Sequence, residues 1–175
     1  MSTPTVLRVA AVQMSSGEDI AANLATAAAL IGRAASEGAA LVLLPENFGL
    51  MARHARDKVA ARERDGDGPQ QAFLARMARL HRQYVIGGSV PLESDDPSRT
   101  RQSLLVYAPG GERVARYDKM HLFRFTHGDE DYDEAKTSSP AAPRSASPCP
   151  AAASDCRSAT TFAFPSFIAR SVTWR

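Results

Sequence analysis

The chain has 175 residues, of which 44% are hydrophobic and 23% are charged, and its formal net charge is +2. This length suits one globular domain with a core of its own, and so small a charge, without a basic run, argues against nucleic acid as a partner. The first apolar stretch is interrupted by Arg8 and Gln13, so it predicts neither a secretory signal nor a membrane span, and we expect a cytoplasmic protein.

The first part of the chain alternates strand and helix patterns. Residues 6–14 form an apolar, β-branched run typical of a buried strand, and residues 39–44 form a second one that ends at Pro45. Between them, Asp19 stands at the N-cap position of a helix over residues 20–37, and Gly38 stands where helices commonly end. This order predicts a βαβ-like unit.

The next segments continue the alternation. Residues 49–65 are charged and compatible with a helix, and Pro69 stands near the start of a further helix. Residues 84–89 predict a third strand, and the runs 103–107 and 113–117 flank a tight turn, which is typical of a hairpin. We therefore expect an α/β layered fold with a largely buried sheet. The side chains expected to form the buried side of the helix that starts near Pro69 are Phe73, Leu74, Met77, Leu80 and Tyr84.

The composition changes after residue 136. Residues 137–161 are rich in Ser, Ala and Pro, which predicts little apolar burial and poor order. We therefore place a folded domain at residues 1–136 and a separate tail at residues 137–175. The two cysteines of the chain, Cys149 and Cys156, both lie in this tail, and no histidines are spaced near them as in a metal site.

Two polar residues directly follow predicted strands. Glu46 comes after the run 39–44, where burial would raise the pKa of a carboxyl group toward that of a useful general base. Lys119 follows the run 113–117 and would supply positive charge to a developing oxyanion. Taken alone, each fits a solvated loop acid or a surface lysine better. His121 fits either a donor on the same face as Lys119 or a structural histidine.

The acidic run at residues 129–134 invites comparison with a calcium loop. It lacks the glycine and the terminal glutamate at the offsets that an EF-hand requires. We therefore expect a solvated acidic loop there.

Three segments together carry a stronger signal than any single residue. Val-Ala-Ala-Val-Gln-Met at residues 9–14, Leu-Leu-Pro-Glu-Asn-Phe at 43–48 and Tyr-Asp-Lys-Met-His-Leu-Phe at 117–123 resemble, in order and spacing, the nitrilase or carbon–nitrogen hydrolase superfamily. The resemblance covers about residues 6–136 and is greatest to the small amidases that act on deaminated glutathione or on ω-amides. It implies a four-layer αββα sandwich, incomplete in this chain, and a homo-oligomer in intact relatives.

The resemblance also implies a Glu–Lys–Cys mechanism on a small-molecule amide, without a metal or organic cofactor. Glu46 matches the general base, Lys119 matches the lysine that stabilises the tetrahedral intermediate, and Glu134 is the nearest match to a second, assisting glutamate. The nucleophile of the family is a cysteine followed by an aromatic, an acid and an arginine, and neither Cys149 nor Cys156 stands in such a motif. We therefore expect this chain to be inactive. The alternative is a non-catalytic relative that binds a small amide or a partner protein, or a pseudogene product.

The coding sequence of the tail is compatible with the missing nucleophile segment if each codon begins one base earlier, at the third base of the preceding codon. In that frame Asp155 and Cys156 must yield Leu, because every Asp codon ends in a pyrimidine and every Cys codon begins with TG. Ser158 with Ala159 can yield Cys, although Gly, Ser or Arg also fit that codon, and the next codons permit Tyr, Asp, Leu and Arg. We infer a one-base slip between about residues 135 and 140, in the gene or in its determination. Resequencing is expected to show it, and an unshifted read through Pro140 would contradict it.

Overall fold

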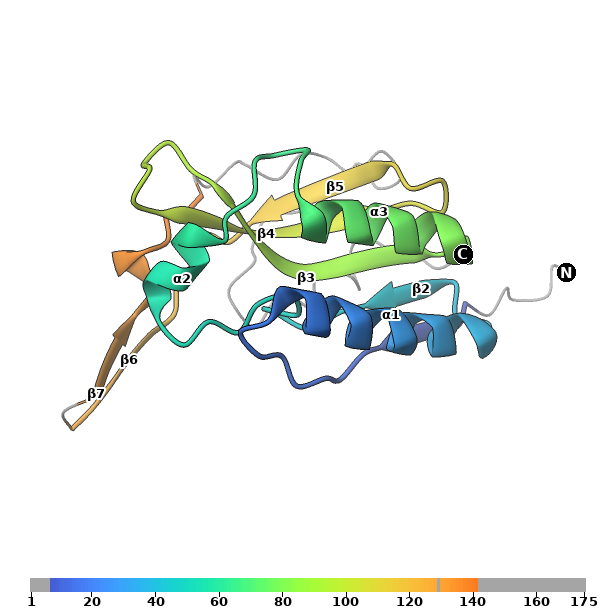
Figure 1. Cartoon of the computed structure of the whole chain (residues 1–175), viewed down its shortest axis with the longest axis horizontal. Coiled ribbons are helices and arrows are strands. Elements are labelled where there is room, and N and C mark those ends of the chain that lie inside the picture. The colour runs from blue at the N-terminus through green and yellow to red at the C-terminus, as the bar shows by residue number, and fades with distance from the viewer. Residues whose placement is uncertain (1–6, 129, 142–175) are drawn as a thin grey trace, which may run out of the picture.

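The computed structural model describes residues 7–128 and 130–141. Within them, one sheet has the strand order β1-β2-β3-β4-β5, in which β1, β2 and β3 are parallel and β4 and β5 are antiparallel to their neighbours. Helices α1 and α3 lie over one face of this sheet, and α2 lies at one end (Figure 1). The predicted α/β class is confirmed. The strands of the sheet are Val9–Ala11, Leu41–Leu43, Tyr84–Glu93, Thr100–Tyr107 and Arg113–Asp118, and the helices are Ile20–Ser36, Ala55–Ala60 and Pro69–His81.

The caps that the sequence predicts for α1 are present. The side chain of Asp19 accepts a hydrogen bond from the backbone N–H of Ala22 at 3.2 Å, which satisfies one of the donors that a helix start leaves open. Gly38 has a φ of +79°, a left-handed conformation that glycine adopts without a Cβ clash. Helix α1 therefore begins after Asp19 and ends before Gly38, as these two capping residues predict.

The main core lies between the sheet and the two long helices. Ile31 of α1 and Leu74 of α3 are fully buried against Val85 and Leu105 of the sheet. Each such side chain removes apolar area from water, worth roughly 1.5–3 kcal/mol per large aliphatic residue. This packing fixes α1 and α3 on the same face of the sheet.

The opposite face of the sheet is apolar as well. The register aligns Ala11, Leu43 and Ile86 across the parallel strands, and Ile86 then faces Val106 of β4. Side chains alternate between the faces of a strand, so these residues point away from the helices. A second apolar cluster on this side contains Leu41, Ile86, Leu104, Val106 and Ala115. Both faces of the sheet therefore carry core-type residues, as expected for a sheet between two layers.

Several local predictions need correction. The first strand covers Val9–Ala11, so residues 7–8 and 12–14 of the expected strand lie outside it, and residue 6 is not among the described residues. Only Ala55–Ala60 of the charged segment 49–65 is helical. Leu80 is exposed, because the buried stripe of α3 runs through Gln70, Leu74 and Met77 and leaves Leu80 at its margin. Tyr84 belongs to β3 and is also exposed.

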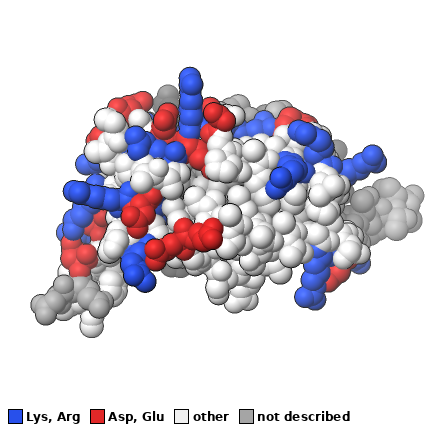
Figure 2. Space-filling model, viewed as in Figure 1, with Lys and Arg blue, Asp and Glu red and all other residues white. Residues whose placement is uncertain are grey.

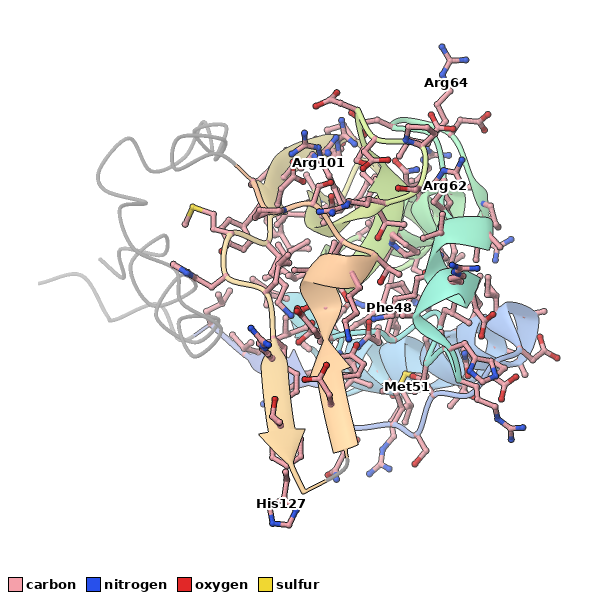
Figure 3. The ribbon with its side chains drawn as sticks, turned by 90° about the vertical axis from the view of Figure 1, so that its left-hand side faces the viewer. Phe48, Met51, Arg62, Arg64, Arg101 and His127 are labelled. Carbon is pink, nitrogen blue, oxygen red and sulfur yellow. The ribbon has the colours of Figure 1, made fainter. Side chains whose placement is uncertain are left out.

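After β5 the chain forms a hairpin that projects from the body of the molecule. Its strands are β6 (Arg124–His127) and β7 (Glu130–Asp133), and the short 3-10 helix η1 (Glu134–Lys136) follows. Figure 3 shows His127 at the tip of this hairpin and η1 at its base. Residues 130–136 are thus strand and helix, so the predicted solvated acidic loop is wrong for this part of the run.

The described chain continues beyond η1 back to the sheet. The backbone of Thr100 donates to the carbonyl of Thr137 at 2.9 Å and accepts from the N–H of Ser139 at 2.8 Å. The boundary at residue 136 stays a prediction, and Cys149, Cys156 and the rest of the tail from residue 142 lie outside the described residues. Among the residues described, one sheet and one helical layer of the expected four-layer sandwich are seen. No helix in this part of the chain has the length and apolar character to cross a membrane.

The loop after β2 comes very close to the backbone of β3 at Gly88. A Cβ atom on Gly88 would lie 1.8 Å from the carbonyl oxygen of Pro45, a distance that requires the backbone to move. We expect Gly88→Ala to lower the free energy of unfolding by about 2 kcal/mol or more, as overpacking does. Urea denaturation measures this change, and Gly17→Ala is the matched control, since nothing lies within 4 Å of a Cβ there. Equal stability of the two variants would contradict the close approach.

Candidate functional site

Three segments that are distant in sequence meet at one end of the sheet. Glu46 lies in the loop directly after β2, Lys119 lies one residue after the end of β5, and Glu134 begins η1. The end of a parallel strand delivers its following loop to one edge of a sheet, which is how Glu46 arrives there. The structure thus brings together all three site residues that the sequence analysis named, while the chemical role of each stays a prediction.

Lys119 is the centre of the site. Its Nζ lies 2.8 Å from Oε1 of Glu46 and 2.9 Å from Oε2 of Glu134. Its side chain is only 14% exposed, and that of Glu134 is 5% exposed. Desolvation by burial lowers the pKa of Lys119, but the hydrogen bonds to Glu46 and Glu134 outweigh it and raise this pKa above the ordinary value. Lys119 therefore stays protonated at neutral pH.

The two carboxylates differ in their surroundings. Glu134 is held on both sides, because its Oε2 accepts from the N–H of Phe123 at 2.8 Å and its own N–H donates to the carbonyl of Phe123. The hairpin β6–β7 connects these two residues, so it returns Glu134 to Lys119. Glu46 keeps 43% of its side chain exposed. Of the two alternatives that the sequence left open for Glu46, this exposure agrees with the solvated loop acid and not with a buried carboxylate, and the carboxylate is open to solvent or to a ligand.

The turn that carries Glu46 is fixed by its neighbours. Asn47 has a φ of +58°, a left-handed conformation that asparagine tolerates better than most residues. Its backbone N–H donates to the hydroxyl of Ser89 on β3 at 2.8 Å, and the carbonyl of Pro45 lies against Gly88. Gly88 and Ser89 of β3 thus hold the backbone in place on the two sides of Glu46.

Sequence reasoning missed one charged residue of the site, Lys58 of α2. This lysine is buried, and its Nζ donates to Oδ1 of Asn47 at 2.9 Å. Desolvation lowers its pKa, and the charges of Glu134 and Glu46 act in the opposite direction. Helix α2 and η1 lie side by side in both ribbon views (Figures 1 and 3). Only a stretch of mixed charge marked this segment in the sequence, so no local signal distinguished Lys58 from a surface lysine.

The surroundings of the site include exposed aromatic rings. Phe123 and Tyr132 at the base of the hairpin have ring centroids 5.7 Å apart. The pKa of Tyr132 is raised, first by burial and then by the charge of Glu134. His121 is exposed and does not continue β5, which ends at Asp118, so the shared strand face expected for Lys119 and His121 is wrong. Figure 2 shows acidic and basic side chains intermingled at this end of the molecule.

The described residues contain no group of three or more His, Cys, Asp and Glu side chains that could hold a metal ion. The cluster instead combines an ionised lysine with two carboxylates that accept hydrogen bonds from its ammonium group. Such a group can remove a proton through Glu46 and stabilise negative charge through Lys119. It needs a nucleophile from elsewhere in order to form a covalent intermediate.

Residues 8–163 match the family model described as carbon-nitrogen hydrolase. The chain is 38% identical over 116 residues to a deaminated glutathione amidase of Yersinia enterocolitica, a match that covers 66% of this chain and 40% of the relative. It is 32% identical over 137 residues to the omega-amidase NIT2 of Homo sapiens, covering 78% of this chain and 48% of the relative. The chain thus spans less than half the length of these curated relatives.

Solved structures agree with these matches. The crystal structure of Nit3 from Saccharomyces cerevisiae, a member of branch 10 of the nitrilase superfamily, superposes with a TM-score of 0.66 at 26% identity. The superposition covers 78% of this chain and 49% of that structure. The fold and the order of its elements are therefore shared with a nitrilase-type protein.

Removal of the central lysine tests the cluster. We expect Lys119→Met to lower the free energy of unfolding by about 2–3 kcal/mol at pH 7, somewhat less than for a fully buried pair, because Glu134 stays buried without its cation. The pKa of Lys119 is raised by folding, so its contribution is complete below the pKa of an unfolded lysine, about 10.4, and is lost as the pH rises through the folded value. Urea denaturation from pH 6 to 11 measures both effects.

The matched control is Lys136→Met, which removes an exposed lysine paired with Asp131 on the surface. This variant is expected to match the parent chain in urea. A Lys119→Met protein as stable as the control would contradict the ion pairs.

Proposed function

The chain belongs to the carbon–nitrogen hydrolase family, and from that premise we propose that its site serves the hydrolysis of the carbon–nitrogen bond of a small carboxylic-acid amide. One observation carries this proposal: the Nζ of Lys119 lies within 2.9 Å of the carboxylates of both Glu46 and Glu134. Glu46 is the general base, Lys119 stabilises the oxyanion and Glu134 holds Lys119 from the buried side. The names of the relatives, a deaminated glutathione amidase and an omega-amidase, support an amide of this size.

The chemistry requires a cysteine nucleophile in addition to these residues. Glu46 takes the proton of the thiol as the sulfur bonds to the amide carbonyl carbon, and the oxygen of the tetrahedral intermediate faces the ammonium group of Lys119. Collapse of the intermediate breaks the carbon–nitrogen bond, and the proton held by Glu46 leaves with ammonia. Water that gives its proton to Glu46 then hydrolyses the thioester, which releases the carboxylic acid and restores the thiol.

The roles of the two glutamates follow from their exposure. A general base must reach the thiol and later a water molecule, and the exposed carboxylate of Glu46 is open to both. Glu134 is buried and fixed by Phe123, so it suits a supporting role for Lys119. The lysine is thereby held as a cation at the point where negative charge develops.

The chain as written does not supply the nucleophile motif. Cys149 stands between two prolines and Cys156 precedes Arg157, and neither is followed by an aromatic, an acid and an arginine. Loss of a nucleophile costs several orders of magnitude in turnover. We propose that the shifted frame, rather than divergence, explains this loss. The missing motif also supports the second candidate, a non-catalytic relative that binds a small amide or a partner protein.

Ammonia release from a small ω-amide distinguishes these possibilities. We expect no turnover from the chain as written, and turnover from the protein encoded after the proposed base is restored. Glu46→Gln in the restored protein is expected to abolish turnover, and Lys136→Met, which alters an exposed lysine outside the site, is expected to preserve it. Ammonia release by the chain as written, sensitive to Glu46→Gln, would overturn the assignment of inactivity. A restored protein that is folded but inert would favour the binding function.

A further inference from the structure

Lysine is rare in this chain, and its distribution is uneven. The sequence holds 21 lysine and arginine residues, and only Lys58, Lys119 and Lys136 are lysines. Lys136 is exposed, whereas Lys58 and Lys119 flank the same two carboxylates. Arginine serves as the cation almost everywhere else in the chain. The site therefore uses the compact ammonium group, which fits between carboxylates as a point charge where a planar guanidinium does not.

Lys58 acts on Glu46 through the backbone that carries it. Its Nζ donates to the side-chain oxygen of Asn47, the residue directly after Glu46, at 2.9 Å. Oδ1 of Asn47 also accepts from the hydroxyl of Ser89 at 3.4 Å, and that hydroxyl accepts from the N–H of Asn47. The left-handed turn at Asn47 is thus held from α2 on one side and from β3 on the other.

Lys58 also balances the charge of the cluster. Glu46 and Glu134 bring two negative charges to a largely buried site, and Lys119 supplies only one positive charge. The charges of both glutamates act on Lys58, and so does the like charge of Lys119. Two carboxylates around a single cation would leave a net negative charge, which favours protonation of one of them. Asp57, the acidic neighbour of Lys58 on α2, is engaged by the N–H of His54 at the start of the helix.

We propose that Lys58 is a positioning residue for the general base Glu46. It holds the turn that carries Glu46 through the side chain of Asn47, and it supplies a second positive charge beside the two carboxylates that surround Lys119. This inference rests on the proposed function for the role of Glu46 as a base. The contacts of Lys58 themselves do not depend on the identity of the substrate.

The small number of lysines makes a direct test practical on the full chain. Labelling with ¹³C,¹⁵N-lysine yields three side-chain spin systems, and the ¹³Cε shift of each follows the protonation of its amine. Burial lowers the pKa of Lys58, whereas the hydrogen bonds of Lys119 to Glu46 and Glu134 outweigh its desolvation and raise its pKa, so we expect the Lys58 signal to titrate at lower pH than the signals of Lys119 and Lys136. A Lys58 signal that titrates together with that of the exposed Lys136 overturns the proposal and requires no variant.

Variants separate the charge of Lys58 from its anchoring role. Glu46→Gln is expected to lower the pKa of Lys58, because a carboxylate charge that raises this pKa is gone, and Lys136→Met is expected to leave it unchanged. Asn47→Gly removes the anchoring oxygen, keeps the left-handed backbone and retains the charge of Lys58. Circular dichroism checks that each variant is folded. An unchanged Lys58 titration in folded Glu46→Gln overturns the charge role.

Turnover of the frame-restored protein supplies the readout for positioning. Lys58→Met is expected to lower kcat by about tenfold or more and to leave KM near the parent value, since the turn that carries Glu46 loses its anchor from α2. Asn47→Gly is expected to have the same effect on kcat, because it removes the oxygen that Lys58 binds. Equal kcat for the parent and both variants overturns the positioning role. If the restored parent itself is inert, the proposed function fails, whereas the lysine titrations still decide whether Lys58 belongs to the cluster.

Discussion

The ammonium group of Lys119 joins three parts of the chain that the sheet alone does not bring into contact. Its hydrogen bonds to Glu46 and Glu134 connect the loop after β2, the end of β5 and the start of η1. A buried carboxylate such as Glu134 is costly to desolvate, and only a paired cation and hydrogen-bond donors make it tolerable. The hairpin β6–β7 returns Glu134 to Lys119, and the chain beyond η1 pairs with Thr100 of the sheet. The same arrangement holds the positive charge of Lys119 beside the exposed carboxylate of Glu46.

The sheet provides the rigid support for this cluster. Helices α1 and α3 cover one face, so β2 and β3 are fixed in register and their ends meet at one edge. At that edge Gly88 and Ser89 of β3 contact the backbone on either side of Glu46. The main chain around Glu46 is therefore held in place by β3, while the carboxylate of Glu46 stays accessible. Site residues on such supports are held more precisely than residues on free loops.

The pKa values of the two lysines of the site are shifted in opposite directions. Lys119 has direct hydrogen bonds to two carboxylates, and these outweigh its desolvation and raise its pKa. Lys58 is bonded to the neutral amide of Asn47, so desolvation prevails and its pKa is lowered. Identical side chains thus differ because one meets charged acceptors directly and the other meets them at longer range. This contrast distinguishes a lysine held firmly as a cation from one that gives up its proton more readily.

Local patterns in the sequence determined the α/β class, the caps of α1, the start of α3 at Pro69 and the hairpin of β4 and β5. They also singled out Glu46 and Lys119, because polar residues that follow apolar strands are visible in a linear pattern. The burial of Glu134, the openness of Glu46 and the presence of Lys58 were decided only by the tertiary structure. The charged segment of Lys58 and the acidic run that ends at Glu134 look solvated in sequence, since the contacts of Lys58 with Asn47 and of Glu134 with Lys119 join different elements of the fold. Burial and pairing depend on contacts between distant segments, and a one-dimensional pattern records only which residues are adjacent.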